Sequence, residues 1–246
     1  MNYSTSVTDF FKSPNWLMNL LLGGICLLLP IVGPMVVLGW LITGFWARQE
    51  EGFVTFPDFD FSHFGKYLER GLWPFLVFLV VMMTFSIVMV PSAWLLMMPA
   101  MLVGGLSSGG EANASGCFGF FAMVLMMVFF TVMICAMMLV LVPLTIRASL
   151  TQDFVKSFDV GFVKRFIALT WMQIVLSSLF VMITGTLFVC LGMIVFCVGI
   201  YFAAVLVYFS WIHLQKQLYM LYLSCGGEPV PLSPKLSFAS PTTQGA

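Results

Sequence analysis

Long apolar runs separated by short polar segments dominate the pattern of this chain. The runs are rich in Leu, Val, Ile, Met and Phe and lack the alternation of a membrane-barrel strand. A helix needs about 20 apolar residues to cross about 30 Å of hydrocarbon. The pattern therefore predicts an all-α integral membrane fold with six transmembrane helices in three hairpins, at residues 16–29, 34–47, 73–98, 118–142, 168–191 and 200–223.

The first of these hairpins is shorter than the other two. Its apolar run, residues 16–47, is interrupted by Pro30-Ile31-Val32-Gly33-Pro34, and two prolines with a glycine argue against one continuous helix. Two helices of about 14 residues would each reach only about 21 Å. A full crossing and a re-entrant hairpin both remain open at this stage.

Two polar connectors combine aromatic and charged residues. Residues 48–72 interleave Phe and Tyr with charges, and residues 147–166 hold a second group of charges. This mixture is typical of helices that lie in the membrane interface, so we expect amphipathic interfacial helices in both connectors. Residues 226–246 contain four prolines among Ser and Thr, which predicts a flexible tail after a single polytopic membrane domain at 1–225.

The composition narrows the class of protein further. Hydrophobic residues make up 61% of the chain and charged residues only 8%, whereas a soluble domain has about 25% charged residues. So few charges cannot solvate a globule of this size. The composition excludes a soluble enzyme, a disordered chain and a nucleic-acid-binding domain, which needs a clustered basic surface.

The positions of the basic residues predict the orientation. With six spans, all ten Lys and Arg residues fall in segments on one side of the membrane. The positive-inside rule makes that side the cytoplasm, so we expect a multi-pass protein with both termini cytoplasmic. A re-entrant first hairpin leaves this assignment unchanged.

A five-residue pattern, D-F-x-x-S, precedes each expected hairpin. It occurs at residues 9–13, 58–62 and 153–157. Asp or Ser can cap a helix N-terminus while Phe anchors the chain at the interface. The pattern favours a parallel repeat of three hairpins, although a chain with 26 Phe also produces short matches by chance.

Another set of residues carries a family resemblance. It consists of Leu38-Gly39-Trp40, Arg48, Gly52, Phe56-Pro57-Asp58-Phe59-Asp60, Tyr67 and Gly71, with later matches at Phe154, Phe158-Asp159, His213-Leu214 and Gln217-Leu218-Tyr219. Over roughly residues 10–225 the chain resembles an uncharacterised family of prokaryotic membrane proteins, the domain of unknown function DUF4013. Phe56 stands where Leu is usual, and Gln215-Lys216 where a Gly often precedes the Gln. The resemblance implies a prokaryotic plasma (inner) membrane protein and supplies no activity.

The expected spans carry little reactive chemistry. They hold no Asp, Glu, Lys or Arg at mid-depth, and such residues mark proton relays, ion pathways and intramembrane catalysis. The two His lie 150 residues apart and the six Cys form no C-x-x-C pair, so we expect no catalytic residue, no cofactor and no metal site. The nineteen Met favour flexible apolar packing over copper ligation.

Polar residues at the expected cytoplasmic interface are the candidates for partner or headgroup contact. His213, Lys216 and Gln217 fall at i, i+3 and i+4 and therefore share one helix face. The full candidate set is Arg48, Asp58, Asp60, His63, Arg70, His213, Lys216 and Gln217. An enzyme that acts on interfacial lipid through Asp58, Asp60 and His63 is the third of our hypotheses.

The first hypothesis is a non-enzymatic membrane scaffold or partner-binding subunit. It would contact the lipid bilayer and a membrane-protein partner or a second copy of itself, and it would bind no nucleic acid. The alternative is a small transporter or channel for a lipid or another apolar solute. That alternative depends on helix breaks at Pro30 and Pro34, at Pro91 and at Pro99.

Overall fold

A computed structural model describes residues 1–47, 56–106, 112–194 and 198–236. Within these ranges it contains helices and no strand, which confirms the expected all-α class. The α-helices are α1 (Tyr3–Thr8), α2 (Trp16–Leu27), α3 (Val32–Trp46), α4 (Phe64–Leu106), α5 (Ala112–Thr151), α6 (Phe154–Ser157), α7 (Val160–Ile194) and α8 (Gly199–Ser224). Three short 3-10 helices accompany them: η1 (Asp9–Lys12), η2 (Phe61–His63) and η3 (Pro234–Leu236).

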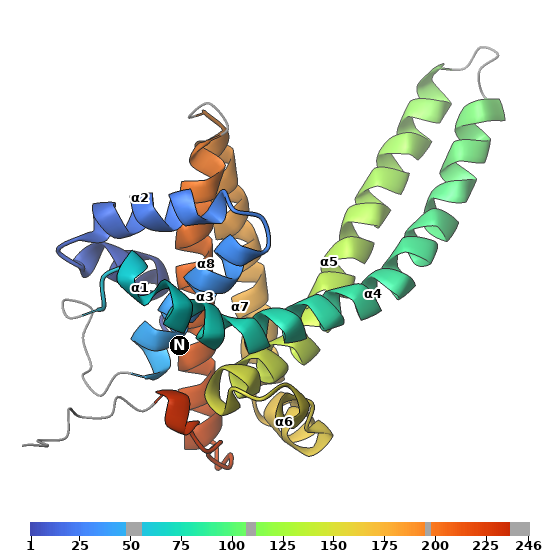
Figure 1. Cartoon of the computed structure of the whole chain (residues 1–246). Coiled ribbons are helices and arrows are strands. Elements are labelled where there is room, and N and C mark those ends of the chain that lie inside the picture. The colour runs from blue at the N-terminus through green and yellow to red at the C-terminus, as the bar shows by residue number, and fades with distance from the viewer. Residues whose placement is uncertain (48–55, 107–111, 195–197, 237–246) are drawn as a thin grey trace, which may run out of the picture. The chain divides into compact units, whose positions relative to one another are not determined.

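The chain divides into two compact units. Unit 1 consists of Met1–Phe78 and Leu139–Ala246, and unit 2 of Leu79–Met138. Unit 2 therefore contains the C-terminal part of α4 and the N-terminal part of α5, both green in Figure 1. The single membrane domain expected at 1–225 stays a prediction.

Helix α8 is at the centre of unit 1, where it contacts α1, α2, α3 and α7. Figure 1 shows α7 and α8 side by side in orange. Small residues allow α2 to approach α8 closely. Gly23 faces Val205, and a Cβ at Gly24 would overlap the ring of Phe202. Close packing of this kind is how helices associate in lipid.

The first apolar run forms two short helices joined by a tight reversal. Helix α2 has 12 residues and α3 has 15, which correspond to about 18 and 22 Å. Between them the Val32 N–H donates to the Pro30 carbonyl at 2.8 Å, and Ile31 has φ 68°. This is a three-residue γ-turn, a strained conformation for a β-branched residue.

Three helical stretches are long and apolar enough to cross a membrane: Phe61–Met98, Phe120–Thr151 and Phe154–Ile194. They include the expected spans at 73–98 and 168–191 and most of the one at 118–142, and they support membrane association. Among the described residues α8, with 26 residues, is not one of the three, because His213, Gln215 and Lys216 lower the hydropathy of its second half. The six-span scheme stays a prediction.

Helix α4 continues through two of the prolines at which breaks were expected. Neither Pro91 nor Pro99 interrupts it, and Pro143 lies inside α5 in the same way. Membrane helices accept proline because neighbouring groups and small local adjustments satisfy the freed carbonyls. Of the expected break sites, Pro30 lies at the α2–α3 reversal and Pro34 in the first turn of α3.

Unit 2 exposes large apolar side chains on both of its helices. Seven of them, each at least 63% exposed, are Ile87, Trp94, Leu95, Phe120, Phe121, Met123 and Met127. A water-soluble monomer rarely shows a contiguous apolar surface of this kind. Such exposure is typical of a part of a protein that lies against lipid or another protein.

The ion pairs of the structure align the three copies of the D-F-x-x-S pattern differently from the sequence. The second copy is shifted by two residues. An Asp lies beside a basic residue three positions later in Asp9–Lys12, Asp60–His63 and Asp153–Lys156, at 2.6, 3.4 and 3.5 Å. The shared pattern is therefore D-F-x-(K/H), and the second copy begins at Asp60 instead of Asp58. Asp60 and Asp153 each accept a hydrogen bond from the backbone N–H two residues ahead, and so cap η2 and α6.

The first and third copies correspond over eight residues. The Ser four positions after the Asp is buried in both, as Ser13 and Ser157. The N-cap of the following helix lies at the seventh position, Asn15 before α2 and Asp159 before α7. Each copy then leads into a pair of contacting helices, α2 with α3 and α7 with α8.

Candidate functional site

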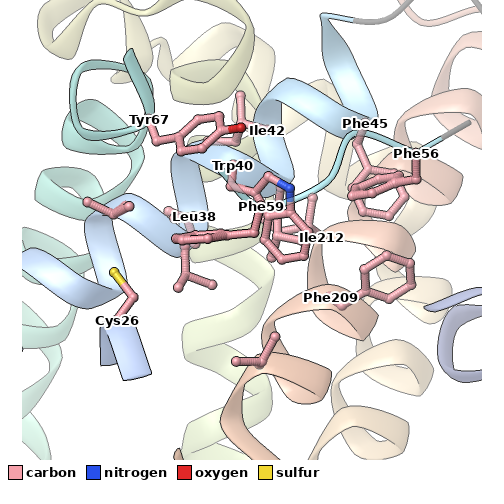
Figure 2. Packing of buried hydrophobic residues seen from close by; sticks show 14 of the residues in the cluster. Cys26, Leu38, Trp40, Ile42, Phe45, Phe56, Phe59, Tyr67, Phe209 and Ile212 are labelled. Carbon is pink, nitrogen blue, oxygen red and sulfur yellow. The ribbon is translucent and has the colours of Figure 1, made fainter. Parts of the chain in front are cut away.

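The residues that carry the family resemblance gather in one place in unit 1. We call this group the signature cluster: Gly39, Trp40, Phe56, Pro57, Asp58, Phe59, Tyr67 and Gly71. Helices α3 and α4 and the segment at 56–59 supply its members. Figure 2 shows Trp40, Phe56, Phe59 and Tyr67 within the packed interior.

Two glycines bring the backbones of α3 and α4 together. A Cβ on Gly39 would overlap the carbonyl oxygen of Tyr67, and a Cβ on Gly71 would overlap the carbonyl oxygen of Met35. Backbone atoms cannot move aside as a flexible side chain can. Both positions therefore require glycine, and they fix where α3 crosses the start of α4.

Trp40 holds the segment at 56–59 against α3. Its side chain is fully buried, and its indole Nε1–H donates to the Pro57 carbonyl at 2.8 Å. The rings of Phe56 and Phe59 meet it edge to face, with centroids at 5.7 and 5.4 Å. Phe56 also packs against Phe209 of α8, as Figure 2 shows.

The Asp58 carboxylate is bound by two asparagines at the start of α2. It accepts from Asn15 Nδ2 at 2.7 Å and from Asn19 Nδ2 at 3.0 Å. Asn19 Oδ1 in turn accepts from the backbone N–H of Phe59 at 2.8 Å. The carboxylate thus joins α2 to the segment at 56–59 and is occupied by groups of the protein itself.

Arg70 joins three helices of unit 1. Its Nη1 donates to the Thr43 hydroxyl oxygen at 2.9 Å, and that hydroxyl donates to the Gly39 carbonyl at 2.8 Å. Gln152 Nε2 donates to the backbone carbonyl of Arg70 at 3.2 Å. Gln152 has φ 51°, the left-handed conformation that commonly ends a helix, and here it follows the last residue of α5.

Asp60 and His63 lie at the exposed cap of η2. The hydroxyl and the backbone N–H of Ser62 both donate to the Asp60 carboxylate and lower the pKa of that carboxyl. His63 Nδ1 lies 3.1 Å from the Ser62 hydroxyl and 3.4 Å from Asp60. A catalytic relay uses one ring nitrogen for the acid and the other for the nucleophile. Here Nδ1 makes both contacts, and the Asp60 carboxylate serves as the N-cap of η2.

His213 lies against the N-terminal segment of the chain. Its Nε2 is 3.8 Å from Asp9, which is only 5% exposed and lies 2.6 Å from Lys12 Nζ. The Phe45 ring stacks on the imidazole with centroids 5.4 Å apart. These contacts connect η1 to α8 in the interior of unit 1.

The rest of the expected α8 contact face also meets the N-terminal segment. The backbone N–H of Asn2 donates to Gln217 Oε1 at 2.8 Å, and Gln217 Nε2 donates to the Asn2 carbonyl at 3.0 Å. Lys216 is partly buried on the same helix. Arg48 lies outside the described residues.

The structure brings some of the candidate residues together and separates others. Asp58, Asp60 and Arg70 lie in or next to the signature cluster, whereas His213 and Gln217 meet the N-terminal segment. Four of the partners lie outside the candidate set: Asn15, Asn19, Thr43 and Gln152. In the sequence, Asn19 and Thr43 stand out because each is a polar side chain inside an apolar run. Nothing in the sequence distinguishes Asn15 or Gln152 from other polar residues.

The polar groups of the signature cluster bond to one another and to Asn15 and Asn19 of the neighbouring α2 segment. They can fasten α2, α3 and α4 to the segment at 56–59, which is a structural task. Among the described residues no group of three or more His, Cys, Asp or Glu side chains is placed to hold a metal ion.

Comparison with known families gives one match. The family model described as protein of unknown function (DUF4013) matches residues 22–197, well over half of the chain. The matched range includes the whole signature cluster. No match was found among curated proteins or among solved structures.

Proposed function

This chain belongs to the DUF4013 family, and on that premise we propose that it is a non-enzymatic integral membrane protein that binds a membrane-protein partner as a scaffold or subunit. It resides in a prokaryotic plasma membrane, crosses it several times and keeps both termini in the cytoplasm. The observation that carries the proposal is the apolar, methionine-rich surface of unit 2.

The dimensions of unit 2 support a position in the bilayer. Each of its two helical arms is roughly 40 Å long at about 1.5 Å per residue, and a bilayer with its headgroups is about 40–45 Å thick. No Lys or Arg occurs between Arg70 and Arg147. An uncharged helix pair of this length fits a complete crossing and return.

The methionines of unit 2 favour a protein partner in addition to lipid. Twelve of the nineteen Met lie in residues 79–138, and Met83, Met98, Met123 and Met127 are each at least 60% exposed. Methionine is unbranched and polarizable, so it adapts to the irregular surface of another helix. Lipid tails alone need no such enrichment.

The signature cluster supports a role without catalysis. Its carboxylate, Asp58, is bound by Asn15 and Asn19, and its indole, Trp40, by the Pro57 carbonyl. The residues that carry the family resemblance thus hold helices of unit 1 together. The surface of unit 2 that is available to a partner is apolar.

Site-specific photocrosslinking in native membranes tests the proposal. A benzophenone side chain would replace Trp94 or Met127 of unit 2, and Ile25 on the exposed face of α2 serves as the matched control. We expect both unit 2 positions to form the same discrete protein adduct, identified by mass spectrometry, and the Ile25 position to form lipid adducts. An adduct between two copies of this chain would identify the partner as the chain itself.

Two outcomes would contradict the proposal. Lipid adducts alone at all three positions would leave no partner for unit 2. Movement of a solute by the purified chain in liposomes, with no other protein present, would favour the transporter. The continuity of α4 through Pro91 and Pro99 removes two of the three breaks on which the transporter depends.

A further inference from the structure

The start of the α2–α3 hairpin, η1 and the segment before η2 are brought together at the surface of unit 1. The bonds from Asn15 and Asn19 to Asp58 join the start of α2 to the segment before η2. The Phe11 ring of η1 packs on Trp16 at the start of α2, with centroids 5.2 Å apart. Segments separated by more than forty residues in the chain therefore lie together here.

This surface, which we call the mouth patch, presents apolar side chains outward. Phe11, Leu17, Met18 and Phe61 are 44–57% exposed, and Lys12 and His63 complete the patch. Aromatic and aliphatic side chains mixed with cationic ones are typical of the boundary between lipid headgroups and acyl chains.

The basic side chains of the mouth patch are already paired within the protein. Lys12 Nζ lies 2.6 Å from Asp9, and His63 lies 3.4 Å from Asp60. A surface that depends on anionic lipid would leave its lysines available for lipid phosphates. The mouth patch instead presents Lys12 and His63 each paired with an Asp beside apolar rings, so we expect its attraction to membranes not to require lipid charge.

Beyond the mouth patch the outer face of the hairpin becomes entirely apolar. Its exposed residues, up to the reversal, are Leu21, Ile25, Leu28, Leu29 and Ile31. The inner face carries the buried Asn19 and the glycines that meet α8. Helices of about 18 and 22 Å are too short for about 30 Å of hydrocarbon.

The reversal pairs four of its backbone N–H groups within the hairpin, which lowers the cost of placing it in hydrocarbon. The N–H groups of Leu28, Leu29, Val32 and Gly33 donate to carbonyls within the reversal and α2, at 2.8–3.1 Å. Pro30 has no N–H to satisfy. The positive φ of Ile31 brings the Val32 N–H to the Pro30 carbonyl. The strained conformation therefore allows this hydrogen bond to form.

We propose that α2 and α3 form a re-entrant hairpin whose reversal lies in the hydrocarbon, and that the mouth patch seats this hairpin at the headgroup boundary of a phospholipid leaflet whatever the lipid charge. The hairpin enters and leaves through the same leaflet. This inference stands independently of any protein partner on unit 2.

Spin-label depth measurements test it on the full chain in phosphatidylcholine vesicles. Nitroxides would be placed one at a time by Phe11→Cys, Phe61→Cys and Ile31→Cys in a chain whose native cysteines are replaced by Ala, with Ile87→Cys of unit 2 as a deep control. Accessibility to oxygen and to a water-soluble nickel chelate gives the depth. We expect positions 11 and 61 at one shallow depth, and position 31 deep and out of reach of the chelate from either side.

Three results would overturn the inference. The chelate could reach position 31 from the side opposite the mouth patch, which would mean a full crossing. Position 11 or 61 could report bulk water. The shallow depth could also change with added phosphatidylglycerol or with salt, which would make lipid charge the cause. If the cysteine-free chain does not fold, benzophenone side chains at the same three positions of the unaltered chain must each crosslink to phospholipid, and an absence of lipid adducts at position 31 would contradict the hairpin.

Discussion

Gly39 and Gly71 are the residues of the signature cluster with the least freedom to change. Each faces a backbone carbonyl of the other helix, so an added methyl group has no flexible neighbour to displace. We expect Gly39→Ala and Gly71→Ala each to destabilise the protein by about 3 kcal/mol or more. Thermal unfolding of the purified chain in mild detergent measures the effect.

Gly65 provides a matched control in the first turn of α4. A Cβ there meets nothing within 4 Å. Because alanine is the better helix former, Gly65→Ala should stabilise the protein by about 0.5–1 kcal/mol. Equal effects at Gly65 and Gly71 would show that the crossing of α3 and α4 does not depend on glycine.

Trp40 gives a second test at the scale of a residue. Trp40→Phe removes the donor to the Pro57 carbonyl and leaves a gap beside Phe56 and Phe59. We expect a loss of about 2–4 kcal/mol in the free energy of unfolding. Trp94→Phe on the exposed surface of unit 2 should change it by about 0.5 kcal/mol or less. A comparable loss at both tryptophans would contradict the role assigned to Trp40.

Members of the signature cluster could be predicted from the sequence where a residue matched the family pattern. Gly39, Trp40, Asp58 and Gly71 stood out through the family resemblance. Their partners did not, because the bonds from Asn15 and Asn19 to Asp58 span about forty residues. Local spacing carries no information about such a contact.

Among the short elements, we expect the caps of η2 and α6 to respond to pH. The backbone N–H of Lys156, with the charge of Lys156 and the N–H of Val155, lowers the pKa of Asp153, and Ser62 lowers that of Asp60. A carboxyl with a lowered pKa in the folded state stabilises that state at neutral pH. This contribution disappears as the pH falls through the folded-state value, below about pH 4.

The variant Asp153→Asn keeps a side chain that can cap α6 but removes the carboxyl group that takes up a proton in acid. Asparagine caps helices as well as aspartate but carries no proton equilibrium in this range. We expect the melting temperature of the variant to fall less than that of the unaltered chain between neutral pH and about pH 3. Asp60→Asn should act in the same direction. Identical acid sensitivity in all three proteins would show that these caps do not contribute.

The long helices were predictable as elements, but their ends were not. The expected span at 73–98 lies in α4, which begins at Phe64 because the aromatic and charged residues before Trp73 continue the same helix. Periodicity alone does not distinguish a separate interfacial helix from an extension of a span. Helix α4 also continues through Pro91, and the sequence pattern alone does not show whether a proline breaks a helix or is accommodated within it.

At the scale of the whole molecule, the proposed orientation separates Lys164 from Glu111, which lies outside the described residues. We expect Lys164→Cys to react with an impermeant thiol reagent only after cells are opened, and Glu111→Cys to react in intact cells. Both labels should be read in a chain whose native cysteines are replaced. Reaction of both positions from the same side would contradict the assignment of the termini to the cytoplasm.

The all-α membrane class could be predicted from the composition and the length of the apolar runs. The division of the chain into two units could not. Apolar runs of sufficient length predict membrane helices because the thickness of hydrocarbon is constant. The runs do not say which helices pack together. That depends on positions such as Gly24 against Phe202 and Gly39 against Tyr67, where the absence of a side chain decides the contact.

The concentration of methionine in unit 2 makes this part of the protein the place where oxidants act. Oxidation to the sulfoxide turns an adaptable thioether into a polar, chiral group, and susceptibility follows exposure. After treatment of the detergent-purified chain with peroxide, mass spectrometry should find sulfoxide at Met83 and Met127 well before the buried Met35. A membrane under oxidative stress would then lose the surface of unit 2 first, while the frame around Trp40 stays intact.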